Sequence, residues 1–112
     1  MALERGKLSN VVVVSAGTTS DIITVASSKK VYVKSIAAYD VTGAGSTAHV
    51  YVVPNGGAVG DATKLYNITL TANETALIEP SYPIVLTTTG DKLSVGSTGA
   101  NINFFITGDK EA

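Results

Sequence analysis

Apolar and polar residues alternate along much of this chain with the two-residue period of β-strands. Residues 101–107 read NINFFIT, so Ile102, Phe104 and Ile106 share one face, and we predict that this face is buried. Residues 64–71 alternate in the same way. No stretch indicates a helix, and the pattern therefore predicts an all-β protein.

The stretch 31–54 is dense in β-branched and aromatic residues, and we predict a central hairpin there, with two strands joined by the glycine-rich linker 42–46. The glycines suit an exposed loop tip. Alternate positions divide into a set predicted to be buried and a set predicted to face water or a neighbouring subunit. The first set is Ile36, Ala38, Val50 and Val52, and the second is Lys34, Asp40, His49 and Tyr51.

Further strands are predicted on both sides of this hairpin, at residues 8–15, 21–26, 64–71, 74–79, 84–88, 92–96 and 101–107. Turn-forming residues separate them, including the long loop 54–62, and the charged residues 108–112 are expected to fray. A chain of about eight or nine short strands predicts an antiparallel β-sandwich with a jelly-roll-like arrangement. The cysteines and tryptophan of an immunoglobulin domain are missing, so we prefer the jelly roll.

The N-terminal segment carries four consecutive valines, Val11 to Val14. They suit a core strand buried on both sides, or an arm that lies against another subunit. We predict that residues 1–14 form an N-terminal arm and first strand, and that residues 15–112 form a single β-sandwich domain.

The composition excludes several kinds of function. The chain has 112 residues, the size of one domain, and 15% of them are charged, with a formal net charge of −1. So few cations do not build a nucleic-acid-binding face. Without cysteine there is neither a disulfide nor a thiolate metal site. No segment resembles a membrane helix or an export signal, so we expect no membrane partner and synthesis in the cytoplasm.

The sequence offers little for catalysis. His49 is the only histidine and lies within a predicted strand, and the carboxylates are mostly isolated at strand ends and turns. The glycines of loop 54–62 lack the Gly-Lys-Ser/Thr ending of a phosphate-binding loop, because Leu65 follows Lys64. We therefore predict no enzymatic activity, no metal site and no cofactor.

A Ser35-Ile36 strand leads to Asp40, the strand 50–54 reads VYVVP, and Leu86 precedes the GDKLSV segment at 90–95. With these motifs, the part of the chain between residues 30 and 108 resembles small virion structural proteins of tailed phages. Asp40 stands where the family more usually has asparagine, and three threonines at 87–89 lengthen the approach to Gly90. The resemblance covers about three quarters of the chain.

This resemblance implies a non-enzymatic virion protein on the capsid surface, most plausibly a decoration or cement protein that binds between capsid subunits. A neck, tail or baseplate subunit is the alternative. The implied partners are the major capsid protein or other virion subunits, and a homo-oligomer, with a trimer favoured. The candidate interface residues are Leu3, Leu8, Val11, Val12, Val13, Val14, Tyr32, Tyr39, Tyr51, Tyr66 and Tyr82.

A carbohydrate-binding β-sandwich module is a second alternative. Such modules normally line up exposed aromatic side chains on one face to stack on sugar rings. This chain has no tryptophan, and its tyrosines fall on separate predicted strands. The composition therefore favours the virion protein.

Overall fold

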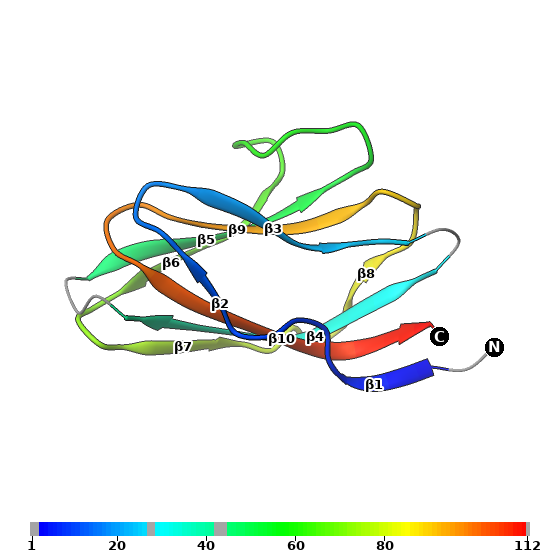
Figure 1. Cartoon of the computed structure of the whole chain (residues 1–112), viewed down its shortest axis with the longest axis horizontal. Helices are drawn as coiled ribbons and strands as arrows, with labels where there is room; N and C mark the ends of the chain where they lie inside the picture. The colour runs from blue at the N-terminus through cyan, green and yellow to red at the C-terminus, as the bar shows by residue number, and fades with distance from the viewer. Residues whose placement is uncertain (1–2, 27–28, 42–44, 112) are drawn as a thin grey trace.

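The computed structural model describes residues 3–26, 29–41 and 45–111. These residues form two antiparallel sheets that face each other (Figure 1). Sheet A contains β1 (Leu3–Lys7), β2 (Val12–Val14), β4 (Val31–Asp40), β7 (Thr75–Ile78), β8 (Ile84–Leu86) and β10 (Ile102–Glu111). Sheet B contains β3 (Thr19–Thr24), β5 (Ser46–Val53), β6 (Lys64–Leu70) and β9 (Lys92–Ser97). The predicted all-β sandwich is confirmed. The described residues form no helix, and hence none that could cross a membrane.

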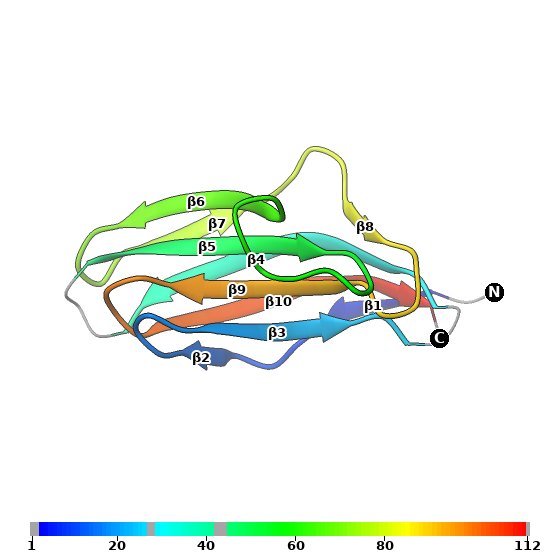
Figure 2. The same ribbon diagram turned by 90° about the horizontal axis from the view of Figure 1, so that it is seen from above.

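The strand order is that of a jelly roll. It runs β1-β10-β4-β7 in sheet A and β3-β9-β5-β6 in sheet B (Figure 2). β2 also pairs with β10, and β8 also pairs with β4, so each edge of sheet A consists of two short strands in succession. Pro80 and Pro83 separate β7 from β8, because proline has no amide to donate to a neighbouring strand. Each sheet thus has four strand positions.

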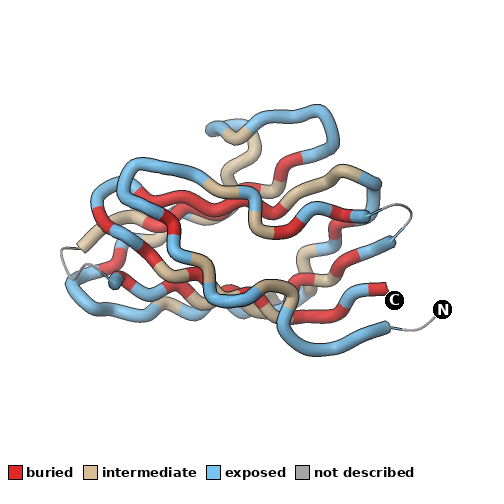
Figure 3. Tube along the Cα trace, viewed as in Figure 1, coloured by how far each residue is buried: buried red, intermediate tan, exposed pale blue. Residues whose placement is uncertain are grey.

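The core lies between the two sheets, where buried and exposed residues alternate along the strands (Figure 3). Ile102, Phe104 and Ile106 of β10 are fully buried, as predicted. Val50 and Val95 of sheet B are buried in the same core cluster. Removing these side chains from water is the main stabilising contribution, at roughly 25 cal/mol per Å² of apolar surface.

The predicted central hairpin is wrong. β4 pairs with β10, β7 and β8, whereas β5 pairs with β6 and β9, so the two strands lie in different sheets. The alternation of residue types is the same in both arrangements, because it sets which face is buried and not which strand is the partner. Ile36, Ala38 and Val50 are buried as predicted, and Val52 packs against the core. The predicted loop tip at 42–44 lies outside the described residues.

Three of the four residues predicted to face water or a neighbouring subunit are buried within the chain. Lys34 is exposed, but Asp40, His49 and Tyr51 are not. Asp40 follows Ile36 and Ala38 on the inner face, and its Oδ2 accepts a hydrogen bond from the Gly45 amide at 2.7 Å. A carboxylate at the end of a core strand is thus satisfied by the turn that follows it.

The expected fraying of the C-terminus is also wrong. β10 continues to Glu111, with β1 on one side and β4 on the other. Asp109 is buried and forms ion pairs with Arg5 and Lys34. Asp109 thus finds charged partners on β1 and β4, so its charge does not keep the segment in solvent. Ala112 lies outside the described residues.

The N-terminal residues pair with β10 of the same chain. β1 and β2 both run antiparallel to it. Val14 is 2% exposed, whereas Val11 is 58% and Val13 is 55% exposed. The four valines are therefore not buried on both sides within this chain. A domain boundary after residue 14 remains a prediction.

Candidate interaction surface

The large apolar side chains that face solvent gather on one sheet. Nine such residues occur in the described parts of the chain: Leu3, Val11, Val13, Tyr39, Val41, Leu65, Leu77, Tyr82 and Val85. All except Leu65 belong to sheet A or to residues directly adjoining its strands. Scattered exposed apolar residues are normal, but a concentration on one layer marks an interaction surface.

The outer face of sheet A has no charge over the end that contains β2 and β7. The strand register aligns Val13, Asn103, Tyr39 and Thr75 in one row across the sheet. The next row contains Phe105, Ala37 and Leu77. Ile102 and Phe104 point into the core, so Asn103 and Phe105 point outward by alternation. We call these two rows the neutral patch.

The charges of sheet A lie at its other end. Asp109 Oδ2 is 2.8 Å from Lys34 Nζ, and its Oδ1 accepts a hydrogen bond from Arg5 Nε at 3.3 Å. The hydrogen bond from Lys34 is the main cause that holds the pKa of Asp109 below its ordinary value, and Arg5 acts in the same direction. This cluster fixes β1 to β10 and to β4, and leaves the neutral patch free of charge.

The outer face of sheet B is polar. Asp21 accepts a hydrogen bond from the Ser94 hydroxyl at 2.6 Å and lies 3.4 Å from Lys92 Nζ. The Ser94 hydrogen bond, with help from Lys92, lowers the pKa of Asp21. Beside them, Lys64 Nζ lies 5.9 Å from the centre of the Tyr51 ring, within the range of a cation–π contact. Asp21, Ser94 and Lys92 thus satisfy one another, whereas the buried Nδ1 of His49 on the same face has no hydrogen-bond partner among the described residues.

His49 is buried next to Tyr51 on this face, with 6.1 Å between the ring centres. Burial is the largest cause that lowers its pKa, and the charge of Lys64 adds to it, while a hydrogen bond with Asn67 opposes both. The imidazole is therefore neutral at pH 7. Ser94, on the neighbouring strand, donates its hydroxyl proton to Asp21 and not to His49. In the described part of the chain, the buried Nδ1 of His49 has no hydrogen-bond partner, so no hydroxyl group is bonded to it.

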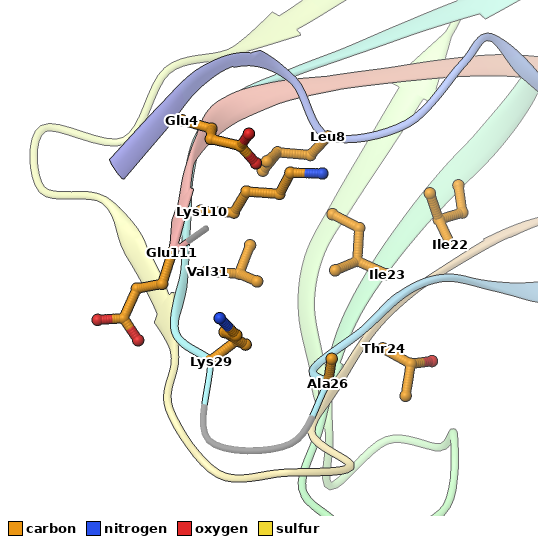
Figure 4. A pocket seen from close by; sticks show the side chains of 10 residues that line it. All are labelled: Glu4, Leu8, Ile22, Ile23, Thr24, Ala26, Lys29, Val31, Lys110 and Glu111. Atoms are coloured by element: carbon orange, nitrogen blue, oxygen red, sulfur yellow. The ribbon is translucent and has the colours of Figure 1, made fainter. Parts of the chain in front are cut away.

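A cavity of about 400 Å³ opens between the sheets at the edge formed by β1 and β3 (Figure 4). Its lining combines apolar side chains with two lysines and two glutamates: Leu8, Ile22, Ile23, Val31, Lys29, Lys110, Glu4 and Glu111. Figure 4 shows the Glu111 carboxylate turned away from the apolar side chains, and its Oε1 accepts a hydrogen bond from the Lys30 amide at 2.8 Å. The equal numbers of lysines and glutamates favour neither anions nor cations. Among the described residues, no group of three or more metal-ligating side chains occurs.

The predicted interface residues fall into three groups by exposure. Leu3, Val11, Val13, Tyr39 and Tyr82 are exposed. Leu8, Val12, Tyr32 and Tyr66 are half-buried, and Leu8 and Tyr66 pack against the core. Val14 and Tyr51 are buried within the chain. The exposed residues and Tyr32 lie on sheet A or next to its strands, so the structure brings these candidates onto one layer.

Sequence reasoning missed Leu77 and Val85, which complete the exposed apolar set on the β7 and β8 edge. Residues 75–78 read TALI, with apolar residues at both even and odd positions. Because strict alternation is missing, the sequence could not show which face of so short a strand is turned outward.

No protein-family model and no curated protein matches this sequence. Among solved structures, the chain is similar to one in the T13 particle of infectious bursal disease virus, with a TM-score of 0.53 and 14% identity over 97% of this chain and 30% of that chain. A chain of the Gx strain of that virus gives a TM-score of 0.51 and 14% identity, over 97% of this chain and 31% of that chain. What these comparisons show is the fold.

A third similar structure is that of the pili of Bacillus endospore appendages. It has a TM-score of 0.47 and 18% identity, over 97% of this chain and 90% of that chain. The present chain spans less than a third of the length of the two viral chains, so it corresponds to one part of them.

Proposed function

We propose that this chain is a non-enzymatic structural subunit of a virion, and specifically a decoration or cement protein on the capsid surface. The observation that carries the proposal is the concentration of exposed apolar side chains on sheet A and its edges, beside a polar sheet B. A protein that binds a particle lattice needs one such layer to bury. The fold shared with chains of a viral particle supports this assignment.

The polar groups give no competing case for catalysis. The buried titratable side chains Asp40, Asp109 and Glu111 accept hydrogen bonds from the backbone or from cations, and none of them faces a nucleophile in the described residues. The fold alone does not decide function, so the proposal rests on the surface.

The proposed partners are the major capsid protein or other virion subunits, and the proposed oligomer is a trimer at a three-fold position. Symmetric oligomers are the usual form of such small subunits, and a trimer presents three copies of the same surface to the lattice. Synthesis in the host cytoplasm followed by incorporation into the virion completes this proposal.

The first test is the mass of the purified protein by light scattering at low and high concentration, together with sedimentation after mixing with expanded capsids. We expect a species of three times the chain mass of 11.4 kDa and saturable binding with a fixed number of copies per capsid subunit. A monomer that does not bind capsids would overturn the proposal. Binding to a glycan array without binding to capsids would instead support the carbohydrate-binding alternative.

A further inference from the structure

Both edges of sheet A are open within the described residues. β1 and β2 pair only with β10, and β7 and β8 pair only with β4. Open edges usually carry charges or bulges that prevent association. Here they carry exposed apolar residues as well as charges: Leu3, Val11 and Val13 on one edge, together with Glu4, Arg5 and Lys7 of β1, and Leu77, Tyr82 and Val85 on the other, together with Glu79. Edges of this kind are expected to be covered.

We propose that sheet A continues from one copy of this chain into the next, with the β7 edge of one copy paired to the β2 edge of its neighbour. This inference rests on the proposed structural role, and it names the contact through which copies associate. The occupant of each edge is a second copy of the same chain, for reasons of strand direction, register and charge.

Strand direction allows this contact. β10 runs antiparallel to β2 and to β4, and β7 runs antiparallel to β4. β2 and β4 therefore point the same way, and β7 points the opposite way. A second copy shifted sideways along the sheet places its β2 antiparallel to β7 of the first copy. Antiparallel pairing supplies backbone hydrogen bonds along the whole contact.

The register then brings apolar residues together. Val12 is opposite Phe104, so Val11 is level with Phe105, whose row continues through Ala37 to Leu77. In a neighbour aligned in the same rows, Val11 lies beside Leu77. These two side chains are 58% and 59% exposed in the single copy, and the contact covers both.

The next row of outward-facing residues, which passes through Thr107 and Ser35, brings opposite charges together. Lys7 is opposite Thr107, which is opposite Ser35. Ile78 is opposite Ile36, so Glu79 follows at the level of Ser35 and points to the same side as Leu77. Within the described residues Glu79 forms no ion pair, and Lys7 binds only Asn10 Oδ1, at 2.8 Å. The aligned neighbour places Lys7 beside Glu79, and this charge complementarity favours a second copy over an unrelated partner.

The loop between β7 and β8 adds to the contact. It projects past this edge of the sandwich in Figure 2 and carries Tyr82, which is 80% exposed. In the aligned neighbour this loop faces β1. Because the two paired edges differ, the contact is head-to-tail, which is the type that builds a ring such as a cyclic trimer when the rotation between copies closes, and an open filament when it does not.

The test uses lysine substitutions at the two edges, since a charged edge residue opposes strand pairing. We expect Leu77→Lys and Val11→Lys each to raise the concentration needed for self-association at least ten-fold in light scattering. The matched control is Leu65→Lys, because Leu65 is 50% exposed on β6, an edge strand of sheet B. This control should associate like the unchanged protein. Circular dichroism and urea unfolding check that each variant is folded.

Mixing the two variants tests the head-to-tail geometry. Leu77→Lys leaves the β2 edge unaltered, and Val11→Lys leaves the β7 edge unaltered. Because only these two edges can pair, an equal mixture should form dimers of one copy of each variant and nothing larger. In the same way, Lys7→Glu and Glu79→Lys should each weaken association, and the double variant should restore it. A two-fold contact between identical edges would show no such rescue.

Three results would overturn the inference: an unchanged protein that stays monomeric at its highest soluble concentration, association blocked by Leu65→Lys but not by Leu77→Lys, or a mixture that forms no mixed dimers. None of these contradicts the proposed function if the protein still binds expanded capsids. Conversely, edge-dependent association without capsid binding would leave the inference intact and contradict the virion role.

Discussion

At the scale of single residues, position 108 requires glycine because the backbone of β4 comes close to it. β4 contains a bulge where the register shifts between Thr107 and Gly108. A Cβ at position 108 would overlap the carbonyl oxygen of Tyr32 and press on the amide of Lys34. The bulge lets Val33 and Ile36 both face the core although three positions separate them.

We therefore expect Gly108→Ala to lower the free energy of unfolding by about 2–3 kcal/mol, because neither backbone can move without breaking strand pairing. Urea denaturation measures this change. The matched control is Gly60→Ala, since a Cβ at position 60 meets nothing within 4 Å. Equal effects of the two substitutions would show that the bulge is not tightly packed.

A second residue-scale prediction concerns pH. The folded protein holds the pKa of His49 below its ordinary value of 6.5, chiefly through burial. The unfolded chain therefore binds a proton more readily, and the stability that the neutral imidazole provides is complete above pH 6.5 and is lost as the pH falls below it. We therefore expect the urea concentration at the midpoint of unfolding to decrease as the pH is lowered from 7 to 5.

The variant His49→Gln should lose this dependence, because glutamine does not titrate. Asp21 and Asp109 also have lowered pKa values, but their contribution is present above the ordinary carboxyl value of 3.8 and is lost only at lower pH. The two pH windows are thus separable. An unchanged slope above pH 5 in His49→Gln would contradict the assignment to His49.

At the scale of elements, the sequence predicts which face of a strand is buried better than it predicts which strands pair with each other. The alternation of NINFFIT correctly predicted that Ile102, Phe104 and Ile106 are buried. The same reasoning joined 31–40 and 46–53 into a hairpin, although these strands lie in different sheets. Partner choice depends on how the whole chain packs, and the residues of two adjoining strands do not contain that information.

Exposure within the candidate surface was equally hard to predict. Tyr51 lies within a predicted strand and Tyr82 lies between two prolines, but both were named as interface candidates because they are tyrosines. In the structure Tyr82 is exposed on a loop, whereas Tyr51 is covered by neighbours on sheet B. An outward-facing residue can still be buried when long side chains from adjacent strands lie over it. Residue type alone therefore identified candidate anchors without separating the exposed from the buried ones.

The N-terminal strand β2 offers a test of which valines hold it in place. Val14 is buried in the core cluster, whereas Val13 faces outward. We expect Val14→Ala to lower the free energy of unfolding by about 2 kcal/mol, through lost apolar burial and a small cavity. Val13→Ala should change it by less than about 0.5 kcal/mol. The pair is compared by thermal or urea unfolding, and similar losses would mean that β2 does not contribute to the core as the structure has it.

At the scale of the whole molecule, the two layers of the sandwich have different surfaces. On sheet B, Asp21, Ser94 and Lys92 satisfy one another. Sheet A exposes apolar side chains and has an ion-pair cluster around Asp109. The outer layer of sheet B is thus the more polar of the two.

The topology also predicts how the chain folds. β1 pairs with β10, the last strand of the chain, and each sheet joins strands from both halves of the sequence. The two ends of the chain must therefore meet before sheet A is complete, and the entropy of closing long loops opposes this step. We expect refolding on a timescale of milliseconds to seconds, measured by stopped-flow tyrosine fluorescence after dilution from urea.

The refolding rate can be limited by pairing of the two chain ends or by assembly of the core strands. Removing residues 1–7 distinguishes these two steps. β1 is exposed along its whole length, so the shortened chain should still fold, and at a similar rate if the slow step is assembly of the core strands. A much faster rate would show instead that closing the two chain ends is limiting. Refolding in microseconds for the full chain would contradict a transition state built from distant strands, since only local contacts form that quickly.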